Sequence, residues 1–224
     1  MTFKGWRFLP RGCGKCCKKG QVLLWRGPYT VFMETIRGYY ESLNLTVHDE
    51  GTWSGVLDDY GLVFWPLAAD LGGGDPSWWS QIVNGSWTGR LVFTAEHSPW
   101  TESIAYVNAQ SGTTGVGIIS ASIDPWYPRL PPVEGFPAPT VANPLTAGVE
   151  SIWMSATSKT SGGTVIAKTL TGAYDWMARN FVDNGLGGTD FVVCGDSNPF
   201  DDSLTLVSNN EAFWKNLWDV ALDA

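Results

Sequence analysis

Short apolar runs that alternate with segments of helical spacing constrain the fold of this chain more than any other feature. The first run, QVLLW at 21–25, is closed by Gly27 and Pro28 and is typical of a buried strand. Apolar residues at 29–43 then recur near helical spacing. Further strands are predicted at 45–49, 61–66, 90–94 and 116–120, and further helices at 78–83 and 99–110. This alternation predicts a doubly wound α/β fold, in which helices flank a mostly parallel sheet on both faces.

The second half of the chain adds β structure and an irregular excursion. Residues 123–144 contain seven of the 13 prolines, which predicts a long Pro-rich insertion packed against the domain. Strands are predicted around a Ser-Gly-Gly turn within 150–169, a last core strand within 190–198, and an amphipathic helix at 209–222. We therefore expect one α/β domain over 21–224, preceded by an N-terminal arm over 1–20.

The arm is strongly basic, whereas the rest of the chain is acidic. Residues 1–19 hold six of the 14 basic residues and no acidic residue, which gives a formal charge of +6. The remaining eight basic and 22 acidic residues give the rest of the chain −14. Such an arm can bind nucleic acid, an anionic surface or the acidic body of a neighbouring copy. We favour the neighbouring copy over nucleic acid, because one protein then supplies both charges.

The arm also carries aromatic residues and three cysteines. Trp6 and Phe8 suit a segment that is buried against a partner. Cys13, Cys16 and Cys17 lie within RGCGKCCKKG, where a C-x-x-C spacing suits zinc but a second ligand pair is missing. The alternatives are disulfides to neighbouring chains and reduced, inert thiols. All three stay open, so zinc is the one cofactor that the sequence suggests.

The first residues contain no secretory signal. MTFKGWRFLP has charges and a proline where an apolar stretch should run. No run approaches the roughly 18 apolar residues that a membrane span needs. We therefore expect synthesis in a reducing cytoplasm and no membrane partner. Cross-linking by the arm would follow only in an assembly that leaves the cytoplasm, such as a virion.

Several stretches, taken in order, are similar to the class I glutamine amidotransferase-like superfamily, which has a flavodoxin-like fold. They are VLLWRGPYT, YGLVFWP, GRLVFTAEHSPWTES, NPLTAGVESI and FVVCGDSNPFDD with NNEAFWKNLWDVAL. The last two resemble non-catalytic branches of that group that are carried by bacteria and phages. The likeness covers most of 21–224 but not the arm.

The resemblance implies a catalytic cysteine in the turn after the 90–94 strand, and this chain lacks it. That turn reads TAEHSP, with Glu96 or His97 at the expected position of the cysteine. Cys194 belongs to the last core strand, and the other histidine is His48. The triad cannot be assembled from these residues, so the resemblance implies a degenerate domain without glutamine hydrolysis.

The TAEHSP turn still offers an alternative chemistry. Because ligands bind at the carboxyl ends of parallel strands, Glu96 and His97 could act as acid and base, with Ser98 as nucleophile of a hydrolase. Asp70 and Asp196 are expected nearby. The structural alternative has Glu96 and His97 bonded to loop backbone and Ser98 at the start of the next helix.

These observations favour a non-enzymatic structural or interaction protein whose partners are copies of itself or other assembly proteins. Its arm, through Trp6, Phe8, Cys13, Cys16 and Cys17, is the expected contact. The other alternative to the hydrolase is a small-molecule or carbohydrate-binding module that exposes tryptophans at 78, 79, 100 and 126.

Overall fold

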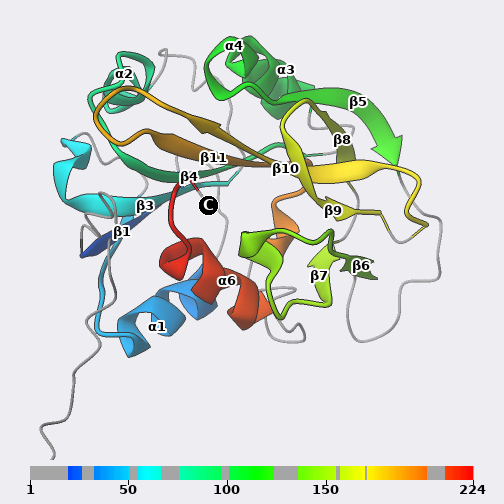
Figure 1. Cartoon of the computed structure of the whole chain (residues 1–224), viewed down its shortest axis with the longest axis horizontal. Coiled ribbons are helices and arrows are strands. Elements are labelled where there is room, and N and C mark those ends of the chain that lie inside the picture. The colour runs from blue at the N-terminus through cyan, green and yellow to red at the C-terminus, as the bar shows by residue number, and fades with distance from the viewer. Residues whose placement is uncertain are drawn as a thin grey trace, which may run out of the picture.

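The computed structural model describes residues 20–26, 33–50, 55–66, 76–96, 101–123, 136–154, 157–169, 171–200 and 210–223. A seven-stranded sheet forms its centre (Figure 1). In spatial order the strands are β2 (Thr46–Glu50), β1 (Gln21–Trp25), β3 (Tyr60–Trp65), β4 (Gly89–Thr94), β11 (Thr189–Cys194), β10 (Asp175–Val182) and β9 (Thr164–Lys168). The first five run parallel to their neighbours, while β10 and β9 pair antiparallel. The predicted α/β class with a mostly parallel sheet is confirmed at this level.

The central strands are continuous apolar runs because both faces of the sheet are covered. Every residue of β4 and β11 is buried, and so are four of the five residues of β1. Alternate residues of each strand therefore enter two different cores. Val22 and Leu24 belong to one core, and Leu23 and Trp25 to the other.

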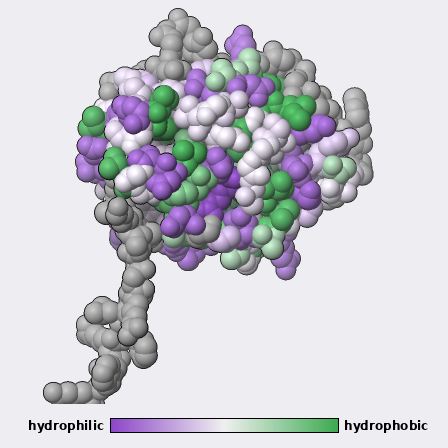
Figure 2. All heavy atoms as spheres, turned by 45° about the horizontal axis from the view of Figure 1, so that its top comes forward, coloured by the Kyte–Doolittle hydropathy of each residue, from purple (hydrophilic) through white to green (hydrophobic). Residues whose placement is uncertain are grey.

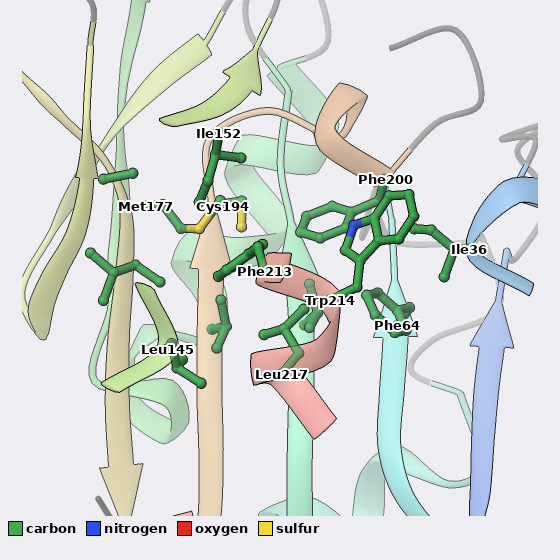
Figure 3. Close-up of a cluster of buried hydrophobic side chains, with 14 of the residues drawn as sticks. Ile36, Phe64, Leu145, Ile152, Met177, Cys194, Phe200, Phe213, Trp214 and Leu217 are labelled. Atoms are coloured by element: carbon green, nitrogen blue, oxygen red, sulfur yellow. The ribbon is translucent and has the colours of Figure 1, made fainter. Parts of the chain in front are cut away.

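Few helices cover the sheet. One core packs under α1 (Glu34–Ser42) and α6 (Asn210–Asp219), and Figure 3 shows Phe213, Trp214 and Leu217 of α6 directed at the strands. The other core contains residues of α2 (Trp79–Val83) and α3 (Thr101–Ala109), which is followed by the short α4 (Ser111–Thr114). With helices this short and few in the described part, the doubly wound arrangement stays a prediction.

The strand predicted at 116–120 is real, but its predicted place in the central sheet is wrong. β5 (Gly117–Ile123) pairs antiparallel with β8 (Thr157–Ser161) in a separate ribbon. β11 takes the position beside β4, because all its residues can be buried there, whereas β5 leaves Ile119 about half exposed. β10 was not predicted at all. Its sequence DWMARNFV places a buried arginine in a strand and does not alternate regularly.

The remaining elements form a smaller layer beside β9. β6 (Phe136–Pro139) pairs with β7 (Ser151–Met154), and both lie below β9 in Figure 1. The single turns η1 (Leu57–Asp59), η2 (Pro144–Thr146) and η3 (Asn198–Phe200) join larger elements. The predicted Pro-rich insertion thus contains a strand, while 124–135 lies outside the described residues. No helix in the described ranges is long and apolar enough to cross a membrane.

Candidate functional site

Glu96 lies two residues after the end of β4, at the carboxyl edge of the sheet, where parallel α/β folds place reactive groups. Its side chain is nevertheless buried, and the residue is only 5% exposed. The carboxylate Oε1 accepts a hydrogen bond of 3.0 Å from the backbone N–H of Ser197 and a second, short one from the Ser197 hydroxyl. Glu96 therefore joins the end of β4 to the loop that follows β11.

The backbone of Glu96 is bonded as well. Its N–H donates to the Ser103 hydroxyl of α3 at 3.0 Å, and its carbonyl accepts from the Ser158 hydroxyl of β8 at 3.1 Å. The nearby helix α3 and two segments that are distant in sequence, β8 and the loop after β11, thus converge on one buried residue. Such a network is favourable where each polar group finds a partner in a low-dielectric environment.

β8 lies against the carboxyl end of β11. The Ser158 N–H donates to the Gly195 carbonyl at 2.9 Å, and the Gly195 N–H donates to the Trp176 carbonyl at 2.8 Å. A side chain at Gly195 would place its Cβ only 2.0 Å from the Ser158 carbonyl oxygen, so glycine is required for this approach. β8 therefore packs directly against this end of β11.

The other predicted site residues do not all join Glu96. Asp196 is fully buried and accepts from the Asn198 N–H at 3.0 Å, which is turn chemistry. His48 lies on β2, with β1 and β3 between it and β4, and its Nδ1 is 3.0 Å from the Tyr60 hydroxyl. The other members of the predicted site, His97, Ser98 and Asp70, lie outside the described residues.

The arm residues predicted to bind metal or a partner lie outside the described residues. Trp6, Phe8, Cys13, Cys16 and Cys17 all precede the first described residue. Cys194 is buried, and burial, followed by the nearby Asp196 carboxylate, raises the pKa of its thiol well above the ordinary value of 9.0. Within the described ranges, no group of three or more His, Cys, Asp or Glu side chains could hold a metal ion.

The expectation that Trp78 and Trp79 are exposed for ligand binding is wrong. Both are at most 1% exposed. Trp78 contacts the edges of Trp25 and Trp65, with ring centroids 5.4 and 5.1 Å apart, and Trp79 stacks on Phe93 at 5.6 Å. Trp78 caps α2 and Trp79 is its first residue, and both belong to the core on this face of the sheet. The other two tryptophans of that hypothesis, at 100 and 126, lie outside the described residues.

A buried charged cluster at the opposite edge of the sheet was missed by the sequence analysis. Asp190 accepts from Arg90 Nε at 2.5 Å and from Arg179 Nε at 2.7 Å, and all three residues are at most 4% exposed. The two guanidinium groups also donate to backbone carbonyls of 216–222 at the end of α6. The sequence contained one sign of this pair. Arg90 is the second residue of GRLVFT and Asp190 is the second residue of TDFVVC, and these two strands are adjacent and in register.

Neither a family model nor a curated protein matches this chain. Seven solved chains do. The N-terminal domain of mmIFT52 has a TM-score of 0.62 at 11% identity, over 88% of this chain and 94% of that one. The exo-β-1,4-mannosidase Op5Man5 from Opitutaceae bacterium strain TAV5 has a TM-score of 0.52 at 13% identity, over 90% of this chain but only 36% of that one. A putative ThuA-like protein from Bacteroides uniformis has a TM-score of 0.49 at 11% identity, over 89% and 91%.

The likenesses to the mmIFT52 domain and to the mannosidase show an α/β fold and nothing more specific. The expected membership of the glutamine amidotransferase-like superfamily is wrong, since no family model matches and neither the mmIFT52 domain nor the mannosidase is a glutamine amidotransferase. The sheet is also mixed, with two antiparallel strands at one end. Buried parallel strands require similar apolar runs in many unrelated proteins, so those runs indicated the fold rather than the family.

Proposed function

We propose that this chain is a non-enzymatic structural or interaction protein that assembles with neighbouring subunits. One observation carries the proposal. Glu96, the described member of the predicted Glu96, His97 and Ser98 set, accepts hydrogen bonds from the N–H and the hydroxyl of Ser197, and β8 lies against the adjacent end of β11. A carboxylate that is buried and bonded in this way supports the fold rather than a substrate.

Electrostatics favour the N-terminal arm as one contact. An arm of +6 and a body of −14 attract each other between copies, and this attraction weakens as salt is added. Trp6 and Phe8 would add apolar area to that contact. Cys13, Cys16 and Cys17 would then reinforce it, either through disulfides or through a zinc ion shared between chains. A virion is one extracellular assembly in which such disulfides would form.

The arm is tested by comparing the full chain with a variant that lacks residues 1–20. The solution mass is measured by light scattering under oxidising conditions, with reductant, and with reductant plus chelator. Assembly through disulfides predicts that the mass falls with reductant, whereas a shared metal predicts a fall only with chelator. An unchanged mass after deletion of the arm would contradict its proposed role.

The alternative, a hydrolase using Glu96, His97 and Ser98, makes the opposite prediction. Glu96→Gln would then abolish turnover of ester, amide and glycoside probes and leave the assembly unchanged. Under our proposal the purified chain shows no turnover that depends on Glu96. The alternative of a ligand-binding module is weakened, because two of the four tryptophans that it needs on the surface, Trp78 and Trp79, are part of the core.

A further inference from the structure

Three segments adjoin one another at the amino edge of the central sheet, where its parallel strands begin. They are 55–59 before β3, 81–88 from α2 to the start of β4, and 183–188 between β10 and β11. The Gln81 side chain joins the first two, because its Oε1 accepts from the Leu57 N–H at 2.8 Å and its Nε2 donates to the Gly55 carbonyl at 3.4 Å. Asn184 joins the third, since its Nδ2 donates to the Trp87 carbonyl at 2.9 Å. In Figure 1 the β10–β11 turn accordingly lies beside α2, and we call these segments together the amino-edge surface.

The amino-edge surface exposes three large apolar side chains. Val56 is 66% exposed, Leu186 62% and Val83 54%. In the described part of the chain six large apolar residues are exposed, and these three are the most exposed of them. On the face that Figure 2 shows, apolar residues form small separate groups among polar ones. A contact here therefore combines a modest apolar area with the charges around it.

Those charges are acidic. Asp58, Asp59 and Asp183 are exposed, the three segments contain no basic residue, and no ion pair of these acids occurs within the described ranges. By contrast, the ion pairs on the exposed sides of α1 and α6 each neutralise an acid with a basic residue one turn away. The buried Arg90 and Arg179 at this edge face α6, which covers the opposite face of the sheet from α2. The amino-edge surface thus lacks a counter-charge of its own.

The N-terminal arm joins the body at this same edge. Gly20, the residue after the arm, forms an antiparallel bridge with Tyr60, directly after η1. The arm has the complementary composition, with six basic residues, no acid, and the apolar Trp6, Phe8 and Leu9. An extended chain from Trp6 to Gly20 spans up to roughly 45 Å, which is enough to reach the same surface on a neighbour.

We infer that the amino-edge surface receives the N-terminal arm of a second copy, with its basic residues beside the three acids and its apolar residues on the exposed valines and leucine. This inference rests on the proposed assembly function and names the surface that the arm contacts. An arm docked on its own body would fill this surface and leave none for a neighbour, so assembly requires the arm of the second copy. Because the arm leaves from the edge that receives it, two copies can exchange arms across a two-fold axis. Opposite charges then meet where two acidic edges would otherwise repel each other.

The first test removes the charges of this surface from the full chain in reductant. The variant carries Asp58→Asn and Asp59→Asn together. Its matched control carries Glu102→Gln and Glu150→Gln, which remove two exposed charges outside the amino-edge surface. We expect the first variant to weaken association at least tenfold in light scattering at physiological salt, and the control to leave it unchanged. An equal loss in both would show that only the net charge of the body matters, which would overturn the inference.

A second variant tests the apolar part of the contact. Val56→Lys replaces the most exposed apolar side chain with a charge that repels the basic arm. Ile119→Lys is the control, because it makes the same change in charge at an exposed residue of β5, outside this surface. We again expect a loss of at least tenfold for Val56→Lys and none for Ile119→Lys. Tryptophan fluorescence checks each fold, and should the aspartate variant misfold, Val56→Lys decides the question alone.

Hydrogen exchange of the peptide that covers 55–65 distinguishes the arm of a second copy from the chain's own arm. Protection that needs both residues 1–20 and a high protein concentration supports the inference. Protection that needs the arm but is equal at every concentration would show that the arm docks on its own body, which overturns it.

The outcomes also separate this inference from the proposed function. If the chain associates, and the aspartate variant and Val56→Lys associate as tightly as the native chain, the arm binds elsewhere. This inference then fails although the chain still assembles. A chain that is monomeric at every concentration overturns both proposals.

Discussion

Arg90 of β4 and Asp190 of β11 face each other in register across two parallel strands, with Nε 2.5 Å from Oδ2. Both residues are fully buried. Arg179 of β10 approaches the other oxygen of the same carboxylate. One acid thus balances two guanidinium groups, and the remaining positive charge is directed at the carbonyl groups that end α6, the negative end of the helix dipole.

Asp190→Asn should destabilise the fold strongly. The change leaves two buried guanidinium groups without a counter-charge, which typically costs about 3–5 kcal/mol. Burial already lowers the pKa of Arg90, and the Asp190 carboxylate opposes that effect. Urea unfolding followed by tryptophan fluorescence measures the free energy of unfolding.

The matched control is Asp219→Asn. Asp219 pairs with Lys215 one turn away on the exposed side of α6, at 2.5 Å. Exposed ion pairs contribute little to stability. A similar loss of stability in the two variants would contradict the structural role of the buried cluster.

Gly195→Ala should destabilise the strand-end region. The new Cβ would lie 2.0 Å from the Ser158 carbonyl oxygen, so β8 must move, and such overpacking usually costs about 1–3 kcal/mol. Gly38→Ala is the control, since Gly38 lies within α1 and a Cβ there meets nothing within 4 Å. Alanine in a helix interior gains about 0.5–1 kcal/mol over glycine. The two glycine changes should therefore have opposite signs in chemical unfolding.

The buried thiol of Cys194 predicts how stability changes at high pH. The folded chain keeps this proton above pH 9.0, whereas the unfolded chain loses it near that pH. Because the unfolded state then binds fewer protons, the free energy of unfolding falls as pH rises above 9, by up to about 1.4 kcal/mol per pH unit. Below pH 9 the thiol is protonated in both the folded and the unfolded chain, so its contribution to the free energy of unfolding is then fully present.

Cys194→Ala isolates this effect. We expect its free energy of unfolding to fall less steeply between pH 8 and pH 10 than that of the native chain. The smaller side chain also changes stability by a constant amount, but this does not affect the slope. Unfolding with urea at several pH values gives both slopes. Equal slopes would show that the Cys194 thiol titrates at the same pH in the folded and unfolded chains.

Glu96→Gln should lower stability, because the amide replaces an ionised acceptor of the Ser197 N–H and hydroxyl. Hydrogen bonds to charged groups contribute about 1.5–3 kcal/mol, and the amide retains part of this. Urea unfolding measures the loss. No change in stability would indicate that the Ser197 contact is not part of the folded structure in solution.

The sequence predicted the strands that are buried on both faces. Few polar residues occur in QVLLW, GLVFW and RLVFT. Short apolar runs of this kind are typical of strands that are buried on both faces of a sheet. It misplaced β5, because VGIIS has the same local composition as a core strand, and only competition with β11 for the position beside β4 excludes it. The pairing of β4 with β11 includes the contact between Arg90 and Asp190, which are 100 residues apart and so outside any local pattern.

The candidate site was predicted only in part. The position of Glu96 at the sheet edge followed from β4 alone. Its partners, Ser103, Ser158 and Ser197, come from α3, β8 and the loop after β11, and no local pattern joins them. Trp78 and Trp79 were misjudged because aromatic side chains suit both a core and a binding surface.

The most direct test of the central claim is the mass of the full chain in solution. Light scattering is measured in reductant at physiological salt, over a hundredfold range of protein concentration. Assembly predicts a mass at least twice the 24.4 kDa of one chain, falling toward one chain on dilution or at high salt. A mass of one chain at every concentration would contradict the account and return attention to Glu96 as a catalytic group.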